Sequence, residues 1–311
     1  MNIVCLGGGH GLARTLEAFV TLGHAPTAIV TVADNGGSTG RLRVDRDIPA
    51  IGDLRHATQA LAEYSEDAAW LAHRFTLGDL AGHALGNLAI LAQLEEGATL
   101  VQALRRIGEM VHIRGQVLPC TNVSVHLRAM DHGQLLMGQV AVQNRDQIGR
   151  LERLWLEPES PRGCPEALDA IAQADVITLG PGSLLTSLAP VLLVPDIAHS
   201  VGHREGIRCL HIANTTTQPG ETDGLLLNEQ CAILLDLIPG DQPIDVLCHR
   251  GPDLAGPGVP LGTTVSHPRV RRVLARDVAV RKHEGVGTGH DRQRLAVALK
   301  EYLETTEGAL G

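Results

Sequence analysis

The sequence has few aromatic residues, no paired cysteine motif and no long apolar run. Trp, Tyr and Phe occur twice each, 2% of the 311 residues, so aromatic platforms for stacking nucleic-acid bases are scarce. The six cysteines are scattered without a C-x-x-C pair, no stretch reaches the ~18 apolar residues that cross a bilayer, and the first residues do not resemble a secretion signal. These absences predict a cytoplasmic protein that is not bound to a membrane.

The charge balance excludes a further class of partner. Lys and Arg number 26 and Asp and Glu 35, which leaves a net charge of −9. A negative protein repels the phosphate backbone of nucleic acids, so we expect no binding to nucleic acid. At 33.0 kDa the chain is long enough to bury a core without the help of disulfides.

The first part of the chain has the pattern of a strand, a glycine turn, a helix and a second strand. Apolar residues 2–6 end at glycine-rich residues 7–11, apolar residues then recur at helical spacing, and residues 28–32 form a second apolar run. Such a βαβ unit is parallel. Further strands are predicted at 175–179, 208–213, 244–248 and 270–275, and helices at 165–174, 228–237 and 292–302. The alternation predicts an α/β fold, a Rossmann-like, mostly parallel sheet in a three-layer sandwich.

Two segments interrupt this alternation. Residues 54–111 have a mostly helical pattern, which predicts a helical insertion after the second strand. Residues 123–129 and 135–142 predict a hairpin that turns at Asp131-His132-Gly133, with residues 151–156 as a further strand. We therefore expect a small β-hairpin subdomain at about 117–157, within a single domain that covers residues 1–311.

Polar, glycine-rich loops follow several of the predicted strands. At the carboxyl end of a parallel strand, the next helix presents free N–H groups and the positive end of its dipole to a ligand. Residues 7–11 and 180–183 both have this setting, and two such loops suggest a diphosphate. The first loop has Leu12 at the last glycine of the dinucleotide motif and lacks the lysine of a P-loop. For this loop, a tight turn without a ligand is the alternative.

The residues after the second strand allow several interpretations. Asp34 has the position of the ribose-binding carboxylate of a dehydrogenase, but residues 35–41 offer N–H groups, hydroxyls and a guanidinium that suit an anion better. Asp34 and Asp53 are also candidates for a Mg²⁺ site. The structural alternatives are a turn residue for Asp34 and a helix N-cap for Asp53.

A third polar loop, residues 214–222, is dense in hydroxyl, amide and carboxylate groups. Gln218 and Glu221 are candidates for contacts with a sugar or a base, and a solvated Pro-Gly turn is the alternative. His83 either lines the pocket or orients a loop. Ser183 has no base partner in the sequence, which argues against nucleophilic catalysis.

Six motifs occur in one order along the chain: GGGHGL at 7–12, VADNGGSTGRL at 32–42, GDLR at 52–55, LAGHALGN at 80–87, GPGS at 180–183 and QPGET at 218–222. Together they resemble the CofD/YvcK-like family, whose bacterial members are known as gluconeogenesis factors. The resemblance extends over nearly the whole chain, and residues 290–293 resemble the YvcK-like branch. It implies a Rossmann-like core that is commonly a homodimer.

The resemblance implies one of two functions. Members of one branch bind UDP-sugars such as UDP-GlcNAc and influence cell shape and envelope synthesis during gluconeogenic growth, which implies a regulatory protein with an unknown protein partner. The other branch contains 2-phospho-L-lactate transferases, which use Mg²⁺ and a nucleotide diphosphate donor. Asn35 stands where these transferases usually have a second acid, which removes a charge from the expected Mg²⁺ site. The first function is therefore our leading hypothesis and the transferase is the alternative.

The resemblance also implies the residues of the site. Asp34 and Asp53 would be catalytic in a transferase and would hold Mg²⁺, the one cofactor that the resemblance implies. The residues expected to bind the nucleotide and its phosphates are Gly8, Gly9, His10, Gly11, Asn35, Gly36, Gly37, Ser38, Arg41, Arg55, His83, Asn87, Gly180, Gly182, Ser183, Thr186, Ser187, Asn214, Gln218, Glu221 and Thr222.

Overall fold

A parallel sheet of seven strands forms the centre of the computed structural model, which describes residues 1–146, 148–251, 258–282 and 285–307. Every pairing in this sheet is parallel. Its strands are β1 (Ile3–Gly7), β2 (Thr27–Val30), β3 (Gln116–Pro119), β7 (Val176–Leu179), β8 (Arg208–Ile212), β9 (Ile244–His249) and β10 (Val270–Arg276).

The strand order places a switch point at the middle of the sheet. The order is β10-β9-β8-β7-β1-β2-β3, so the chain proceeds outward from β1 on one side and from β7 on the other. Leu6 of β1 is in register with Leu179 of β7, and the loops after these two strands therefore leave the sheet side by side. Ligands bind in open α/β sheets at this point.

The central strands are buried on both faces, as expected for a parallel sheet. All five residues of β1 and all four of β7 are buried, and the six cysteines are buried free thiols. Burial in the core raises the pKa of Cys5 to about 12, so it remains a thiol. The apolar runs found in the sequence are thus core strands, and the predicted α/β fold is confirmed.

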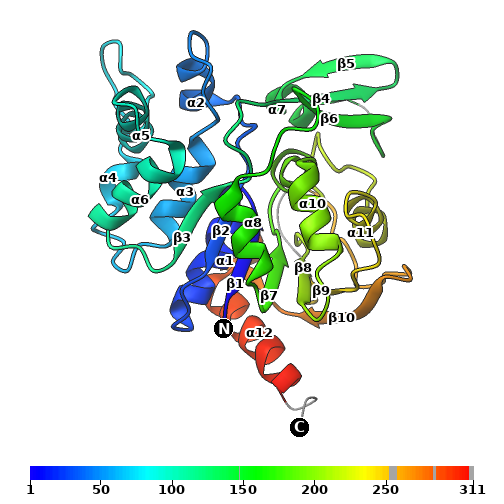
Figure 1. Cartoon of the computed structure of the whole chain (residues 1–311). Coiled ribbons are helices and arrows are strands. Elements are labelled where there is room, and N and C mark those ends of the chain that lie inside the picture. Colours follow the sequence, from blue (N-terminus) through cyan, green and yellow to red (C-terminus); the bar gives the residue numbers. More distant parts are fainter. Residues whose placement is uncertain (147, 252–257, 283–284, 308–311) are drawn as a thin grey trace.

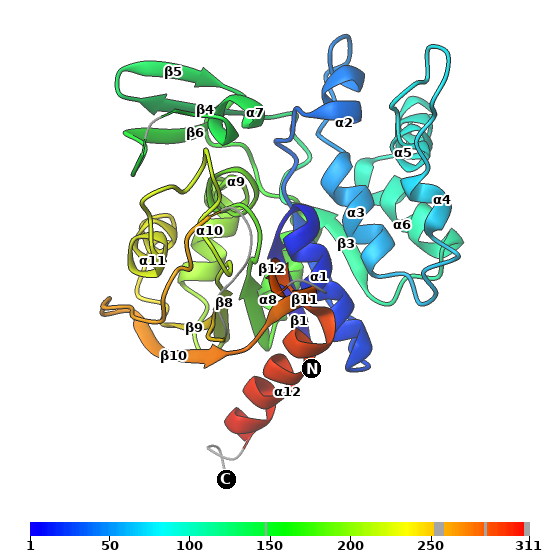
Figure 2. The same ribbon diagram turned by 180° about the vertical axis from the view of Figure 1, so that it is seen from behind.

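Helices cover both faces of the sheet. α8 (Pro165–Ala172) and α10 (Pro195–Gly202) pack together and lie on the side nearer the viewer in Figure 1. α1 (Gly9–Thr21) packs against α12 (Arg292–Glu307) and against α3 (Gly52–Ala60), and α1 and α12 are in front in Figure 2. The chain also forms α11 (Leu227–Asp236), which lies beside α10 in both views.

The segment between β2 and β3 is helical, as predicted. It contains α2 (Gly37–Leu42), α3, α4 (Ala69–Ala72), α5 (Leu85–Glu95) and α6 (Leu100–Met110). β3 was not expected from the sequence. This strand has only two apolar residues, which lie between Gln116 and the final Pro119. It pairs with β2 as the edge of the main sheet. The antiparallel unit therefore begins later than expected, at His126.

The predicted hairpin is present, with one correction. β4 (His126–Asp131) pairs with β5 (Gln134–Met137) and with β6 (Arg153–Glu157) in an antiparallel sheet of three strands. Residues 139–142, predicted as strand, instead belong to α7 (Gln139–Gln143). Gly138 ends β5 because its φ of +89° leaves the strand conformation. A separate two-stranded sheet is formed by β11 (Ala279–Lys282) and β12 (Gly285–His290).

The loop after β7 leads into a short π-helix, η1 (Leu184–Leu188), and then into α9 (Ala189–Leu192). Among the described residues, no single helix has both the length and the apolar composition to cross a bilayer. Residues 184–192 and α10 meet these two criteria only when they are taken together as one segment, and this segment is bent by 82°.

Candidate ligand-binding site

A cavity of about 580 Å³ lies at the switch point of the sheet. Its walls come from the loops after β1 and β7, from α1, α3, η1 and α7, from the loop after β8, and from the β11–β12 hairpin. The lining residues are Gly8, Gly9, His10, Gly11, Arg14, Asp53, His56, Gln139, Gln143, Gly182, Ser183, Ser187, Asn214, Gln218, Val280, Gly289 and His290.

The two glycine loops are in direct contact. A Cβ atom at Gly11 would lie 2.6 Å from both the backbone nitrogen of Gly182 and the carbonyl oxygen of Pro181. A Cβ atom at Gly182 would lie 3.1 Å from the carbonyl oxygen of Gly8. The loops predicted to hold a diphosphate therefore meet at one edge of the sheet, and the lack of side chains allows this close approach.

Asn214 and Gln218 hold the second glycine loop. The Oδ1 atom of Asn214 accepts a hydrogen bond from the Gly182 N–H (3.2 Å), and its Nδ2 donates to the Gly182 carbonyl oxygen (2.9 Å). The Nε2 of Gln218 donates to the Ser183 hydroxyl (3.0 Å) and its Oε1 accepts from the Nδ2 of Asn214 (3.2 Å). Both residues line the cavity, and their amides are occupied by protein groups.

Glu221 and Thr222 lie behind this wall. Glu221 is 2% exposed, and its carboxylate accepts hydrogen bonds from the Leu185 N–H (2.8 Å) and the Thr186 hydroxyl (3.3 Å). Burial raises the pKa of Glu221, and these hydrogen bonds oppose the shift. Thr222 accepts a hydrogen bond from the Gln218 N–H (2.8 Å). Both side chains therefore support η1 and the loop from inside the protein.

Basic side chains line the cavity beside the first loop. The rings of His10 and His56 lie 4.9 Å apart, and the half-exposed Arg14 pairs with Glu17. Burial and the neighbouring His56 lower the pKa of His10. Because a guanidinium can only donate, Arg55 fixes the Nε2 of His56 as an acceptor at 2.6 Å. A bound anion would raise the pKa of His10 and favour its charged form.

Asp34 and Asp53 form a pair of carboxylates near the first loop. A Cβ atom at Gly8 would lie 2.4 Å from the Oδ2 of Asp53, and one at Gly52 would lie 3.3 Å from the Oδ2 of Asp34. Burial and the charge of Asp53 raise the pKa of Asp34 to about 6. Of these two repelling carboxylates, Asp53 lines the cavity. Such a pair fits Mg²⁺, which usually takes one or two protein carboxylates plus phosphate oxygens and waters. Among the described residues, no three acidic, His or Cys side chains form a metal-binding group.

Several predicted ligand-binding residues instead form a buried network beside the cavity. Asn87 donates to the Ser38 hydroxyl (3.1 Å) and accepts from the Nε of Arg55 (3.0 Å). The Nδ1 of His83 lies 3.1 Å from the same hydroxyl, and Arg41 donates to the Ala81 carbonyl oxygen (2.7 Å). The network joins α2 to α3 and α5, so the LAGHALGN motif supports the loop that carries Asp34.

The remaining predicted residues also have identifiable places. Asn35 accepts a hydrogen bond from the Val140 N–H at 3.2 Å, which connects the Asp34 loop to α7. The Gly36 N–H donates to the Oδ1 of Asp34 (2.8 Å), and Gly37 follows as the first residue of α2. The Gly180 N–H continues the sheet by donating to the Leu6 carbonyl oxygen (2.9 Å).

Sequence reasoning missed several lining residues. Arg14 lies four residues after His10 on α1, and His56 follows the GDLR motif, so helical spacing could have indicated both. Gln139 and Gln143 could not be found in this way because their segment was predicted as strand. Val280, Gly289 and His290 come from a hairpin that the sequence pattern did not reveal.

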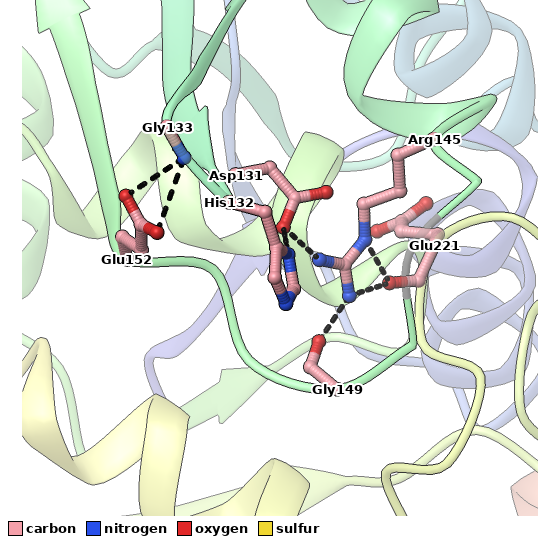
Figure 3. A network of polar contacts seen from close by, with 7 residues as sticks. All are labelled: Asp131, His132, Gly133, Arg145, Gly149, Glu152 and Glu221. Carbon is pink, nitrogen blue, oxygen red and sulfur yellow. Dashed lines mark hydrogen bonds and ion pairs between the residues drawn. The ribbon is translucent and has the colours of Figure 1, made fainter.

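Arg145, just after α7, is the centre of a buried polar network (Figure 3). Its side chain is 1% exposed and lies 3.4 Å from the Oδ1 of Asp131, the last residue of β4. It also donates to the carbonyl oxygens of Gly149 and Glu221. The network connects the antiparallel sheet to the loop that supports η1.

Comparison with known proteins identifies a matching family model and several related proteins. A family model described as 2-phospho-L-lactate transferase CofD matches residues 3–252. The gluconeogenesis factor of Halalkalibacterium halodurans is 36% identical over 93% of this chain and 88% of its own length. That of Bacillus subtilis is 42% identical over 71% of this chain and 70% of its own length. The match to a "Putative gluconeogenesis factor" of Deinococcus radiodurans is 37% identical and spans 98% of this chain but 66% of that protein.

Solved structures confirm the fold. A crystal structure of a protein from Bacillus halodurans superposes with a TM-score of 0.83 at 31% sequence identity. The superposition covers 96% of this chain and 98% of that one.

Proposed function

The chain belongs to the CofD family, and from this membership and the cavity at the switch point we propose that it binds the diphosphate of a nucleotide sugar of the UDP-GlcNAc kind. The observation that carries the proposal is the contact of Gly11 with Pro181 and Gly182. It brings the N-terminus of α1 to the loop before η1. Backbone N–H groups and the α1 dipole would face the two phosphates together.

The basic residues of the cavity support an anionic ligand. Arg14 and the two histidines, His10 and His56, line the side of α1 and α3. The lowered pKa of His10 leaves it neutral in the free protein, and it would gain a proton when a diphosphate binds. We therefore expect binding to take up protons and to strengthen as the pH falls from 7.5 toward 6.

The relatives' names support a biological role. Curated relatives from two organisms are called gluconeogenesis factors, and we propose that this chain is one as well. From the family resemblance we further propose that it is a regulatory protein needed for cell shape and envelope synthesis during gluconeogenic growth. The proposal includes action in the cytoplasm, a homodimer, and a protein partner that responds to the bound state.

Thermal unfolding with a panel of ligands tests the binding proposal. UDP-GlcNAc, GDP and NAD would each be added to the purified protein with and without Mg²⁺. A ligand present at 100 times its dissociation constant stabilises the fold by about 2.7 kcal/mol. We expect UDP-GlcNAc to raise the melting temperature without Mg²⁺. Stabilisation by NAD alone, or by none of the three, would reject the proposal.

A Mg²⁺-dependent transferase is the second candidate, and the carboxylate pair favours it. The pKa of Asp34 is raised by burial and by Asp53, and the Gly36 N–H, Arg43 and His56 oppose this shift only in part. Carboxylates with raised pKa values are typical of functional sites. Bound Mg²⁺ would neutralise the charge that develops on the leaving nucleotide when an acceptor hydroxyl attacks the β-phosphate. Asp34 and Asp53 would hold the ion, while the glycine loops and Arg14 would orient the donor. Asn35 stands where the transferases usually have an acid. It accepts a hydrogen bond from the Val140 N–H of α7. Stabilisation by GDP that requires Mg²⁺ would favour the transferase.

A further inference from the structure

The cavity has two walls of different chemistry. The glycine loops, His10 and Arg14 form a wall of N–H groups and basic side chains. α7, which belongs to the antiparallel unit, contributes Gln139 and Gln143 to another part of the lining. These two residues are four positions apart on a helix and therefore point to the same side. Their carboxamides are uncharged and carry both donors and acceptors.

Four carboxamide side chains line the cavity, and they differ in which of their donors and acceptors remain available to a ligand. Asn214 and Gln218 use their donors and acceptors on the second glycine loop and on each other. Gln143 donates from Nε2 to the Thr186 hydroxyl (3.3 Å), and none of the described residues donates a hydrogen bond to its Oε1. The Oε1 of Gln139 is shielded from solvent and has no hydrogen-bond partner in the described part of the chain. A buried acceptor without a donor costs about 1–3 kcal/mol, so the Gln139 carboxamide would gain by turning its Oε1 toward a ligand hydroxyl or N–H.

α7 is held in place from both ends. At its start, Gly138 packs so closely on Asn35 that a Cβ atom would lie 2.1 Å from the Nδ2 of Asn35, whose Oδ1 accepts from the Val140 N–H. Just past its end, buried Arg145 is bonded to Asp131 and to Glu221 (Figure 3). The glutamine side chains therefore start from a backbone that is fixed before any ligand binds, which lowers the entropy cost of recognition.

We propose that Gln139 and Gln143 bind the uncharged, hydroxyl-bearing sugar that is attached to the diphosphate, and so set the preference of the site for a nucleotide sugar over a nucleoside diphosphate. This inference rests on the proposed diphosphate site at the glycine loops. A carboxamide adds no charge that would attract phosphate, but it pairs well with hydroxyl and amide groups. The glycine wall thus supplies affinity for the diphosphate and the α7 wall selects what the diphosphate carries.

Calorimetric titration with UDP-GlcNAc and with UDP tests this division. The wild-type protein is expected to bind UDP-GlcNAc more tightly than UDP. In Gln139→Leu and in Gln143→Leu this preference should fall by roughly 5- to 10-fold, the loss of about one hydrogen bond each. The affinity for UDP should change by less than about twofold. Gln134→Leu is the matched control, because Gln134 is an exposed glutamine on β5 of the same unit, and it should leave both affinities unchanged.

The outcomes separate this inference from the proposed function. Equal binding of the two ligands by the wild type, or an unchanged preference in both leucine variants, would overturn the role of α7 and leave the diphosphate site standing. A variant that loses affinity for UDP and UDP-GlcNAc equally would also overturn it. If the wild type binds neither ligand, the proposed function itself fails. Should a leucine variant fail to fold, Gln139→Met keeps the length of the side chain without its hydrogen-bonding groups or any charge, and the same loss of preference is expected.

Discussion

The guanidinium of Arg145 donates two hydrogen bonds, from Nε at 3.3 Å and from Nη2 at 3.1 Å, to the backbone carbonyl oxygen of Glu221. The carboxylate of the same Glu221 accepts a hydrogen bond from the Leu185 N–H at the start of η1. One buried residue of the antiparallel unit is thereby connected, through a single intermediate, to the loop that forms part of the cavity wall (Figure 3).

Replacement of Arg145 should therefore destabilise the fold. In Arg145→Met the carboxylate of Asp131, 3% exposed, loses its buried cation, and we expect the free energy of unfolding to fall by about 3–5 kcal/mol. Urea denaturation measures this change. Arg150→Met is the control, since Arg150 forms only an exposed pair with Asp236 and should cost less than about 1 kcal/mol. Equal effects of the two substitutions would contradict the assigned role of Arg145.

Gly11→Ala should force the two glycine loops apart. The new Cβ atom would lie 2.6 Å from backbone atoms of Pro181 and Gly182, which cannot yield as a flexible side chain would. We expect a loss of stability of about 1–3 kcal/mol and a weaker binding of diphosphate ligands, both measurable by thermal unfolding with and without UDP-GlcNAc. Ala13→Ser, on the same helix, should leave binding unchanged. Normal ligand affinity in Gly11→Ala would show that the cavity does not depend on this contact.

Asp34→Asn should stabilise the free protein at neutral pH. The pKa of Asp34 is raised to about 6 in the fold by burial and by Asp53, from an ordinary 3.8. The folded state then binds more protons than the unfolded state between these values, so stability falls as the pH rises from 3.8 to 6 and stays lower above. The variant should gain about 3 kcal/mol at pH 7 and nothing below about pH 4.

The same variant should lose any stabilisation by Mg²⁺, because one of the two carboxylates is gone. Asp45→Asn, a change at an exposed residue, serves as the control for both measurements. A Mg²⁺ response that survives in Asp34→Asn would place the ion elsewhere.

Buried histidines should make the fold sensitive to acid. Burial lowers the pKa of His211 and of His290 from 6.5 to about 4. The unfolded state therefore binds more protons than the folded state between pH 6.5 and 4, and stability decreases as the pH falls through this range. Each residue should cost about 2 kcal/mol at pH 5 relative to pH 7.5.

His211→Asn tests this effect, because the asparagine amide can replace the Nδ1 atom that lies 3.0 Å from the Leu179 carbonyl oxygen. Its stability should change less between pH 7.5 and 5 than that of the wild type. His73→Asn is the control, because His73 is exposed, and its pH dependence should match the wild type. If the stability of His211→Asn and that of the wild type changed equally between pH 7.5 and 5, the lowered pKa of His211 would be contradicted.

Much of the fold could be read from residues close together in the chain. Apolar runs such as residues 3–7 and 176–179 become strands buried on both faces, and the turn at Asp131-His132-Gly133 is confirmed. β3 and α7 could not be predicted in this way. The first is a short edge strand that owes its conformation to β2, and the second follows Gly138, whose positive φ fits against Asn35.

The site shows the same division. The sequence by itself determined which loops carry glycine and polar groups, because turn formation and side-chain chemistry are local properties. Only the tertiary structure decided which of these groups face the cavity. Ser183 and Gln218 line it, whereas Glu221 and Asn87 are buried in hydrogen bonds to the protein. Gln139 and Gln143 reach the cavity from the antiparallel unit. The physical reason is that the direction of a side chain depends on strand order and on packing between segments distant in the chain.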